Sequence, residues 1–264
     1  MKFIQLDLLK MNKIKLNKIY NEDCLKTLRR MKDNSIDIVI TSPPYNMNLR
    51  IRNGEYCSRQ VIKEISTKYE NFSDNLPIKQ YYDFHSKVLT ELLRVSKLIF
   101  YNIQIVSGSK RSVFKMIGEF SDFLKDIIIW DKGHGQPSIQ KQVLNRRTEL
   151  ILVFETDYPI SRQFREKGYF ERGQLDDIWQ IRRETKKNKD HGAVFPQELV
   201  AKILENFSKP SDIVYDPFMG TGTTALVAKK LNRSFIGSEI NKQYVNYSLE
   251  RLANIGELFE AHGK

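Results

Sequence analysis

Residues 212–239 read DIVYDPFMGTGTTALVAKKLNRSFIGSE, and the order of patterns within this stretch decides the fold. A short apolar run ends at Asp216, a turn with two glycines follows, and the Ala-, Leu- and Val-rich segment 223–231 is typical of a helix. A second apolar run, 234–238, ends at Glu239. Strand, turn, helix and strand in this order form the repeating unit of a parallel α/β sheet, so we predict that class of fold.

The turn between the first strand and the helix has the features of a nucleoside-binding site. Gly220 and Gly222 let the backbone approach a ligand closely. Glu239 follows Asp216 by 23 residues, close to the spacing of ~20 at which an acidic side chain meets ribose hydroxyl groups. The glycines alone also fit a dinucleotide pattern and leave a nicotinamide oxidoreductase open, whereas the turn lacks the lysine of a phosphate P-loop.

Alternating patterns of the same kind run along the rest of the chain. Strand character is found at 14–20, 36–41, 97–105, 126–130, 149–154 and 212–215, and helical spacing at 82–95, 113–123, 196–207 and 242–253. These patterns predict a doubly wound, mostly parallel sheet in one domain, 13–264, after an N-terminal extension, 1–12, in which Met11 is an alternative start. A long basic loop, 46–80, and a charged insertion at the rim of the sheet, 155–190, interrupt the alternation.

The composition excludes several classes of protein. Among the 264 residues, 41% are hydrophobic and 28% charged, which is typical of a folded globular chain. The net charge of +11 favours an anionic partner, nucleic acid first and an anionic membrane second. Two distant cysteines and four scattered histidines predict neither a disulfide framework nor a metal site. The cysteine usage fits a reducing cytoplasm. No apolar run reaches the ~18 residues of a membrane span, and Asp7 and lysines interrupt the apolar start, so we expect a cytoplasmic protein.

A second motif, TSPPYN at 41–46, follows the continuous apolar run IDIVI. Such a run is typical of a parallel strand buried on both faces, so we expect the motif at the carboxyl end of the sheet. Pro43 and Pro44 extend the chain and remove two N–H donors. Ser42 adds a side-chain oxygen and Tyr45 a flat ring. Together they predict a pocket that accepts hydrogen bonds from the amino group of a planar base and stacks against the base.

On these two motifs the sequence resembles the S-adenosylmethionine-dependent amino DNA methyltransferases of restriction–modification type. The resemblance is to the beta order, in which the catalytic motif precedes the cofactor motif, and it covers about 13–252. It implies a Rossmann-like methyltransferase fold with a small DNA-recognition region inserted at 155–190, S-adenosylmethionine as methyl donor, and no metal. The family's catalytic tetrapeptide, [Ser/Asp/Asn]-Pro-Pro-[Tyr/Phe], is matched by Ser42, Pro43, Pro44 and Tyr45.

The resemblance also implies a set of cofactor-binding residues. The family's Asp-Pro-Phe-x-Gly-x-Gly motif and the start of its helix correspond to Asp216, Pro217, Phe218, Gly220, Gly222, Thr223 and Thr224. The ribose-binding acid falls on Glu239, and the His-x-x-x-Phe-Pro element that touches the methionine end falls on His191, Phe195 and Pro196. The acid that meets the adenine amino group corresponds to Asp23, with Cys24 beside it. A looser match links the family's Trp-x-Lys and a following Glu to Trp130, Lys132 and Glu149.

These matches predict methyl transfer to the exocyclic amino group of a base flipped out of duplex DNA. Within the family, Ser-Pro-Pro-Tyr is associated with the cytosine amino group, so we favour 4-methylcytosine over 6-methyladenine. Direct transfer is expected, because neither cysteine lies in a nucleophile motif. Hydrogen bonds from the amino group to the Ser42 hydroxyl oxygen and the Pro43 carbonyl favour a pyramidal nitrogen, which can attack the sulfonium methyl group of S-adenosylmethionine.

Double-stranded DNA is the expected partner, and basic residues within 50–63 and 162–189 are candidates for phosphate contacts. A cognate restriction endonuclease and a second copy of the chain are further candidate partners. Three alternatives stay open at this point: an amino methyltransferase acting on RNA, one acting on a protein glutamine, and a DNA-binding module without activity.

Overall fold

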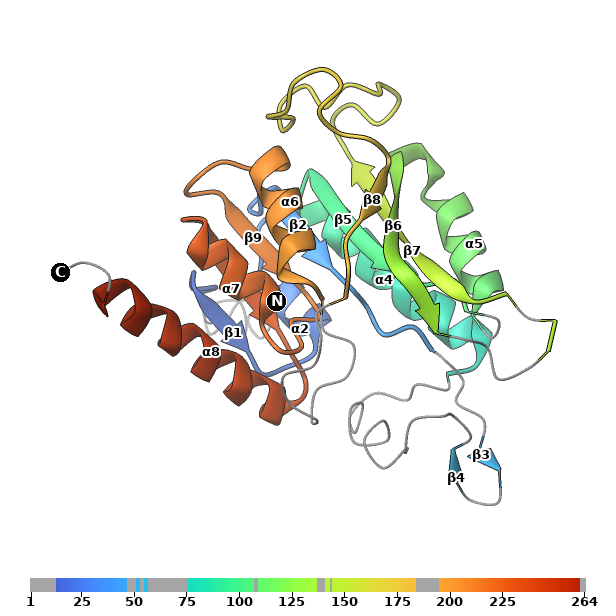
Figure 1. Cartoon of the computed structure of the whole chain (residues 1–264), viewed down its shortest axis with the longest axis horizontal. Helices are drawn as coiled ribbons and strands as arrows, with labels where there is room; N and C mark the ends of the chain where they lie inside the picture. Colours follow the sequence, from blue (N-terminus) through green and yellow to red (C-terminus); the bar gives the residue numbers. More distant parts are fainter. Residues whose placement is uncertain are drawn as a thin grey trace, which may run out of the picture.

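The apolar runs of the sequence become the strands of one mixed sheet (Figure 1). The structure is a computed structural model that describes residues 13–46, 51–52, 55–56, 76–106, 109–136, 141–142, 144–183 and 195–261. The spatial order of the eight strands is β1-β10-β9-β2-β5-β7-β6-β8. In that order they are Lys18–Tyr20, Ser234–Ser238, Ile213–Asp216, Ile38–Thr41, Leu98–Ile103, Arg146–Glu155, Leu124–Gln136 and Ile178–Gln180.

Strand directions divide the sheet into two parts. β1, β10, β9, β2 and β5 are all parallel, so their carboxyl ends share one edge, here called the carboxyl edge. β7 lies antiparallel between β5 and β6, and β8 pairs parallel with β6. The carboxyl edge is therefore also where β6 ends and β7 begins. Separately, β3 (Ile51–Arg52) and β4 (Glu55–Tyr56) form a two-stranded ribbon.

Helices cover both faces of the sheet, as the doubly wound pattern predicts. One face packs against α2, α4 and α5, and the other against α6, α7 and α8. Successive residues of β2 point to opposite faces. Ile38 and Ile40 pack in the core on the side of α6, α7 and α8, and Val39 packs in the core on the side of α2, α4 and α5. All three are fully buried, which explains the continuous apolar run. The helices are α2 (Cys24–Leu28), α4 (Ile78–Val95), α5 (Lys110–Glu119), α6 (Gln197–Phe207), α7 (Thr223–Lys230) and α8 (Lys242–Ala261).

Most predicted elements are present, and the differences have local causes. The expected helix 113–123 ends at Glu119, because a short 3-10 turn, Ser121–Phe123, turns the chain into β6. Strands β6 and β7 are longer than predicted, because they pair as a hairpin beyond the apolar segments. The short strand β8 lies inside the segment expected to be an irregular insertion. Within the described residues, no helix combines the length and the hydropathy needed to cross a membrane.

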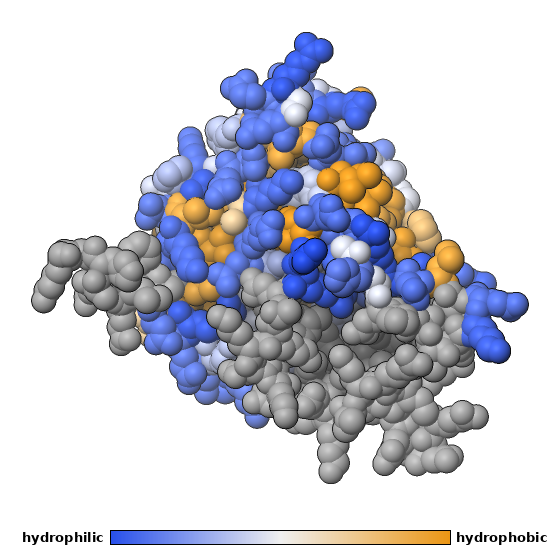
Figure 2. Space-filling model, in the orientation of Figure 1, coloured by the Kyte–Doolittle hydropathy of each residue, from blue (hydrophilic) through white to orange (hydrophobic). Residues whose placement is uncertain are grey.

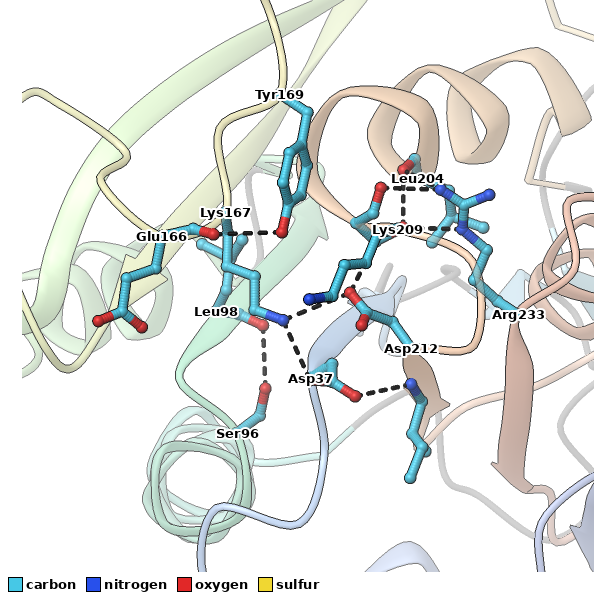
Figure 3. A network of polar contacts seen from close by, with 12 residues as sticks. Asp37, Ser96, Leu98, Glu166, Lys167, Tyr169, Leu204, Lys209, Asp212 and Arg233 are labelled. Atoms are coloured by element: carbon cyan, nitrogen blue, oxygen red, sulfur yellow. Dashed lines mark hydrogen bonds and ion pairs between the residues drawn. The ribbon is translucent and has the colours of Figure 1, made fainter.

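The structure divides the insertion 155–190 between opposite edges of the sheet. Since β7 is antiparallel to β5, Glu155 lies at the amino edge, and residues 156–177 form a loop there before β8 returns toward the carboxyl edge (top of Figure 1). Lys167 of this loop pairs with Asp37 and Asp212, which precede β2 and β9 (Figure 3). Lys167 falls within the range 162–189 that we named for phosphate contacts, and its charge is paired here with two carboxylates. Its ammonium group attaches the loop to the sheet.

A second attachment of this loop is fully enclosed. The side chain of Lys125 in β6 forms an ion pair with Glu155, and the two are 0% and 5% exposed. The Lys125 ammonium also donates to the carbonyls of Tyr158 and Gln163, at 2.8 and 2.9 Å. Removing one member of a buried pair leaves the other charge without compensation, which is costly in an apolar surrounding.

We predict that Lys125→Met lowers the free energy of unfolding by about 3–5 kcal/mol, because Glu155 and two carbonyls lose their partner. Urea denaturation measures the loss. The double variant Lys125→Met/Glu155→Leu should recover most of it, because no unpaired charge remains. Arg162→Gln, on the exposed part of the same loop, is the control, with a change within about 0.5 kcal/mol. Equal losses in the single and double variants would contradict this assignment.

Candidate functional site

The two sequence motifs lie side by side at the carboxyl edge. β2, which leads into Ser42, and β9, which ends at Asp216, are neighbouring strands. The Thr41 hydroxyl donates to Asp216 Oδ1 at 2.8 Å, which joins residues 175 positions apart in the sequence. The parallel sheet therefore places the proposed acceptor edge next to the proposed nucleoside turn.

Asp216 organises the turn that follows it. Its Oδ1 also accepts from the Phe218 backbone N–H at 3.0 Å, and Oδ2 accepts from the Thr224 hydroxyl at 2.7 Å. Both oxygens therefore have partners within the protein, and Asp216 is only 4% exposed. Burial raises the pKa of its carboxyl to about 6, although the hydrogen bonds act in the opposite direction. The side chain thus joins the glycine turn to the end of β2 and to the start of α7.

Two glycines of the turn adopt backbone conformations that other residues rarely take. Gly220 has φ +51° and Gly222 has φ +80°. A Cβ atom on Gly222 would lie 2.7 Å from the Ser248 Cβ in α8, so only glycine allows this close packing. The Gly220 N–H donates to Glu239 Oε2 at 2.8 Å, which joins the turn to the end of β10.

The end of β10 and the start of α2 complete this half of the site. Glu239 is half-buried, burial raises its pKa, and its Oε1 accepts from the Asn241 N–H at 2.8 Å. The Asn21 side chain donates to the Glu239 carbonyl at 2.9 Å, so the loop after β1 is held beside it. Asp23 is exposed and caps α2 through the Leu25 N–H.

The remaining predicted cofactor residues differ in their surroundings. Cys24 is 4% exposed within the core, and burial raises the pKa of its thiol. Pro196 is buried at the start of α6, and the Phe195 ring lies edge-on to Trp130 with centroids 6.2 Å apart. Trp130 is a buried core residue. His191 lies outside the described residues. The cofactor roles of these residues stay predictions.

The Pro-Pro-Tyr segment is held from the side of α4. The Tyr81 hydroxyl donates to the Pro44 carbonyl at 2.9 Å, and the Ser109 hydroxyl donates to the Tyr45 carbonyl at 3.1 Å. None of the described residues donates to the Pro43 carbonyl. This carbonyl and the Ser42 side chain are the acceptor positions that the sequence predicts for an amino group.

The Tyr45 hydroxyl belongs to a hydrogen-bonded chain that spans four strands. It donates to Glu149 Oε2 at 2.7 Å, and the Ser42 hydroxyl lies 2.8 Å from it. Because the Tyr45 hydroxyl donates to Glu149, the Ser42 hydroxyl donates to the tyrosine oxygen. The Ser42 oxygen accepts a long hydrogen bond from the Asn102 amide, at 3.4 Å, and keeps a second lone pair that can accept. The Asn102 amide donates to Tyr45 and to Glu149, both at 2.7 Å.

Glu149 is the charged end of this chain. It is 4% exposed, and its Oε1 accepts from the Lys132 ammonium at 2.9 Å and from Arg183 at 3.2 Å. Burial alone raises the pKa of Glu149, but the Lys132 charge and the hydrogen bonds from Asn102 and Tyr45 outweigh burial and hold it below its usual value. The carboxylate is therefore ionised at neutral pH.

The structure adds residues that the sequence motifs did not identify. Asn102 and Tyr81 contact the Pro-Pro-Tyr motif directly, and Thr41, which opens that motif but was given no role, contacts the glycine turn through Asp216. A signal for Asn102 and Thr41 is present in the sequence, because each is a polar residue at the end of an apolar strand that leads to the carboxyl edge. Tyr81 gives no such signal. In the part of the chain that the structure describes, no group of three His, Cys, Asp or Glu side chains is arranged to hold a metal ion.

Comparisons with solved structures agree with this arrangement. The fold matches the PvuII DNA methyltransferase, described as cytosine-N4-specific, with a TM-score of 0.67 and 20% identity over 94% of this chain and 93% of that one. It also matches the M1.HpyAVI–SAM complex, with a TM-score of 0.57 and 22% identity over 89% and 99%. These structural similarities show a shared methyltransferase fold, which confirms the predicted fold class.

Sequence relatives are found across most of the chain. The type II methyltransferase M.BglII (Bacillus subtilis) is 29% identical over 90% of this chain and 69% of its own length. M1.MboII (Moraxella bovis) is 26% identical over 88% and 95%. The family model for N6/N4 DNA methylases matches residues 36–250, a span that includes both motifs and the Glu149 cluster. The chain therefore belongs to the N6/N4 family of DNA methylases.

Proposed function

We propose that the protein transfers a methyl group from S-adenosylmethionine to the amino group of cytosine in duplex DNA, forming 4-methylcytosine. Membership of the family makes it an amino DNA methyltransferase. The finer assignments are ours. The observation that carries the methyl-transfer reaction is the contact between the two halves of the site, where Thr41 of the acceptor strand donates to Asp216 of the glycine turn.

The glycine turn fits an S-adenosylmethionine-binding site. Glu239 ends its strand beside Gly220, where its carboxylate can accept from ribose hydroxyl groups. Asp23 is exposed at the start of α2, in the loop after β1 that Asn21 holds beside Glu239. There its carboxylate is a partner for the adenine amino group. Phe195 and Pro196 then border the methionine end. Bound there, S-adenosylmethionine supplies an electrophilic methyl group on a positively charged sulfur.

The acceptor edge fits a target amino group. No described residue donates to the Pro43 carbonyl, and the Ser42 oxygen accepts only the long hydrogen bond from Asn102 at 3.4 Å. Each therefore has a lone pair available, and two acceptors match the two N–H bonds of an exocyclic amino group. The Tyr45 oxygen accepts a hydrogen bond from the Ser42 hydroxyl, because the Tyr45 hydroxyl itself donates to Glu149. Glu149 thus acts as a positioning residue, whose negative charge makes the Ser42 oxygen a stronger acceptor.

The choice of cytosine rests on Ser42. The motif resembles the Ser-Pro-Pro-Tyr form associated with the cytosine amino group, and the PvuII enzyme, which shares the fold, is named as cytosine-N4-specific. The alternative is 6-methyladenine, whose amino group presents the same two donors. The type II names of the relatives support a restriction–modification setting with a cognate endonuclease.

The proposed reaction predicts a single modified base. Purified protein, S-adenosylmethionine and unmethylated duplex DNA should yield 4-methylcytosine on digestion to nucleosides and mass spectrometry. Ser42→Ala is the matched negative control. Detection of 6-methyladenine would overturn the base assignment and keep the reaction class. Methylation of RNA in preference to duplex DNA would overturn the substrate.

Glu239 should matter for the cofactor alone. We predict that Glu239→Ala weakens S-adenosylmethionine binding about 10- to 100-fold in calorimetric titration, because hydrogen bonds to a charged group are worth about 1.5–3 kcal/mol. Duplex DNA binding should stay unchanged. Glu250→Ala, on the exposed side of α8, is the control. Unchanged affinity in Glu239→Ala would remove this residue from the cofactor site.

The positioning role of Glu149 predicts a change in the pH profile. Glu149→Gln should lower kcat about 100-fold with unchanged cofactor affinity, because the Ser42 hydroxyl loses its fixed orientation. Lys132→Met removes the charge that lowers the pKa of Glu149, so this pKa rises. The acid limb of the rate profile should then move to higher pH. Lys115→Met, exposed in α5, should leave the profile in place. An unmoved limb in Lys132→Met would contradict the requirement for an ionised Glu149.

A further inference from the structure

The outer half of the β6–β7 hairpin carries positive charge beside the Tyr45–Glu149 contact. Along β7, Arg146 precedes Glu149 by three residues, so its backbone lies about 10 Å beyond the Glu149 backbone at the rise of a β-strand. The pairing register shifts between Asp131 and Gln136, an irregularity that bends strands next to active sites. The paired strands of the hairpin therefore extend beyond Glu149 at the carboxyl edge.

Three basic side chains in or beside the outer part of the hairpin have no acidic partner among the described residues. Lys141 and Arg146 belong to the hairpin, and Arg182 follows β8 with its Cγ 3.8 Å from the position of a Cβ on Gly133. All three are exposed. Arg147, next to them, forms a two-bond pair with Asp131, which leaves it largely neutralised. We call Lys141, Arg146 and Arg182 the hairpin surface.

The hairpin surface is connected to the site by the residue that follows it. Arg183 is half-exposed, and its guanidinium donates to Glu149 Oε1 at 3.2 Å. The exposed Arg182 is thus followed directly in the chain by Arg183, which donates to the same Glu149 carboxylate that accepts from Tyr45. No comparable link connects the loop 156–177 to the site within the described residues.

That loop carries three arginines, Arg162, Arg165 and Arg172, but lies at the opposite edge. Glu155, where it begins, is six residues beyond Glu149 on β7, a separation of about 20 Å. Lys125 and Lys167 fix the loop there. Figure 2 shows hydrophilic side chains both at the top of the view, over this loop, and at the right, near the end of the hairpin, so surface polarity does not distinguish the two.

The reaction geometry does distinguish them. A nucleotide that rotates out of the base stack keeps its phosphates in the duplex backbone, so the duplex must lie across the edge where the target pocket opens. Arginine forks bind phosphate oxygens in pairs, and such contacts supply most of the salt-dependent affinity for DNA. Only charges at the carboxyl edge are within reach of the flanking phosphates.

We propose that the hairpin surface binds the DNA phosphates that flank the target nucleotide, and that the exposed arginines of loop 156–177 take no part. The proposal rests on the function proposed above and adds the part of the chain that holds the substrate. It also limits target recognition within the insertion 155–190 to residues from β8 onward. A sequence-level charge count treats both parts of that insertion alike.

Two matched double variants of the full chain test this. Arg146→Gln/Arg182→Gln should weaken duplex DNA binding about tenfold at low salt and reduce the slope of log K against log salt by about 2, because each lost phosphate contact removes about 0.9 from the slope. Arg162→Gln/Arg172→Gln removes the same charge from exposed positions of the loop and should change neither quantity. S-adenosylmethionine affinity should be unchanged in both.

Methylation of the same samples separates this proposal from the proposed function. If the wild type binds duplex DNA and the slopes differ as expected, but no methylated base forms, the function is overturned and the hairpin surface stands. If methylation occurs and the two double variants behave alike, or the loop variant loses more affinity, the hairpin surface is overturned alone. Absence of salt-dependent duplex binding by the wild type would also overturn it.

Discussion

A buried carboxylate that must find partners is the constraint on which the rest of the site depends. Asp216 lies at the end of a central strand, and burial raises its pKa to about 6. A native carboxyl with a raised pKa binds its proton more tightly than the unfolded chain does, so its contribution to stability falls as pH rises from about 4 to 6. The hydrogen bonds from Thr41, Thr224 and the Phe218 N–H limit that loss. The same three bonds determine where the glycine turn and the Pro-Pro-Tyr segment lie.

The acceptor half depends on β7, the one strand of the eight-stranded sheet that runs opposite to the others. Because β7 runs antiparallel to β5, the start of β7 meets the ends of β2 and β5 at the carboxyl edge. Glu149 thereby reaches Tyr45 and Asn102, and Lys132 from β6 neutralises it within the protein. A fully parallel sheet would place the start of that strand at the far edge. The reversal therefore brings a negative charge to a motif whose own first residue, Ser42, is neutral.

How much the sequence could predict differs between fold and site. The strand-turn-helix pattern and the apolar run before Ser42 were sufficient for the sheet, its two helical layers and the meeting of the two motifs, because parallel strands align their carboxyl ends. The network around Glu149 was only partly predictable. Lys132 and Glu149 followed from a loose family resemblance, whereas their contacts with Tyr45 and Asn102 depend on the register of β6, β7 and β5, which no local pattern specifies.

Strand direction also explains why a charged stretch of sequence is a poor guide to a nucleic-acid surface. Residues 155–190 look continuous, yet β7 delivers their beginning to the amino edge and β8 returns their end to the carboxyl edge. Lys167 and Arg182 are 15 residues apart; one joins Asp37 and Asp212 at the base of the sheet, and the other stands against Gly133 above the site. Two basic residues in one segment can therefore do unrelated work, structural support in one case and, as we propose, phosphate binding in the other.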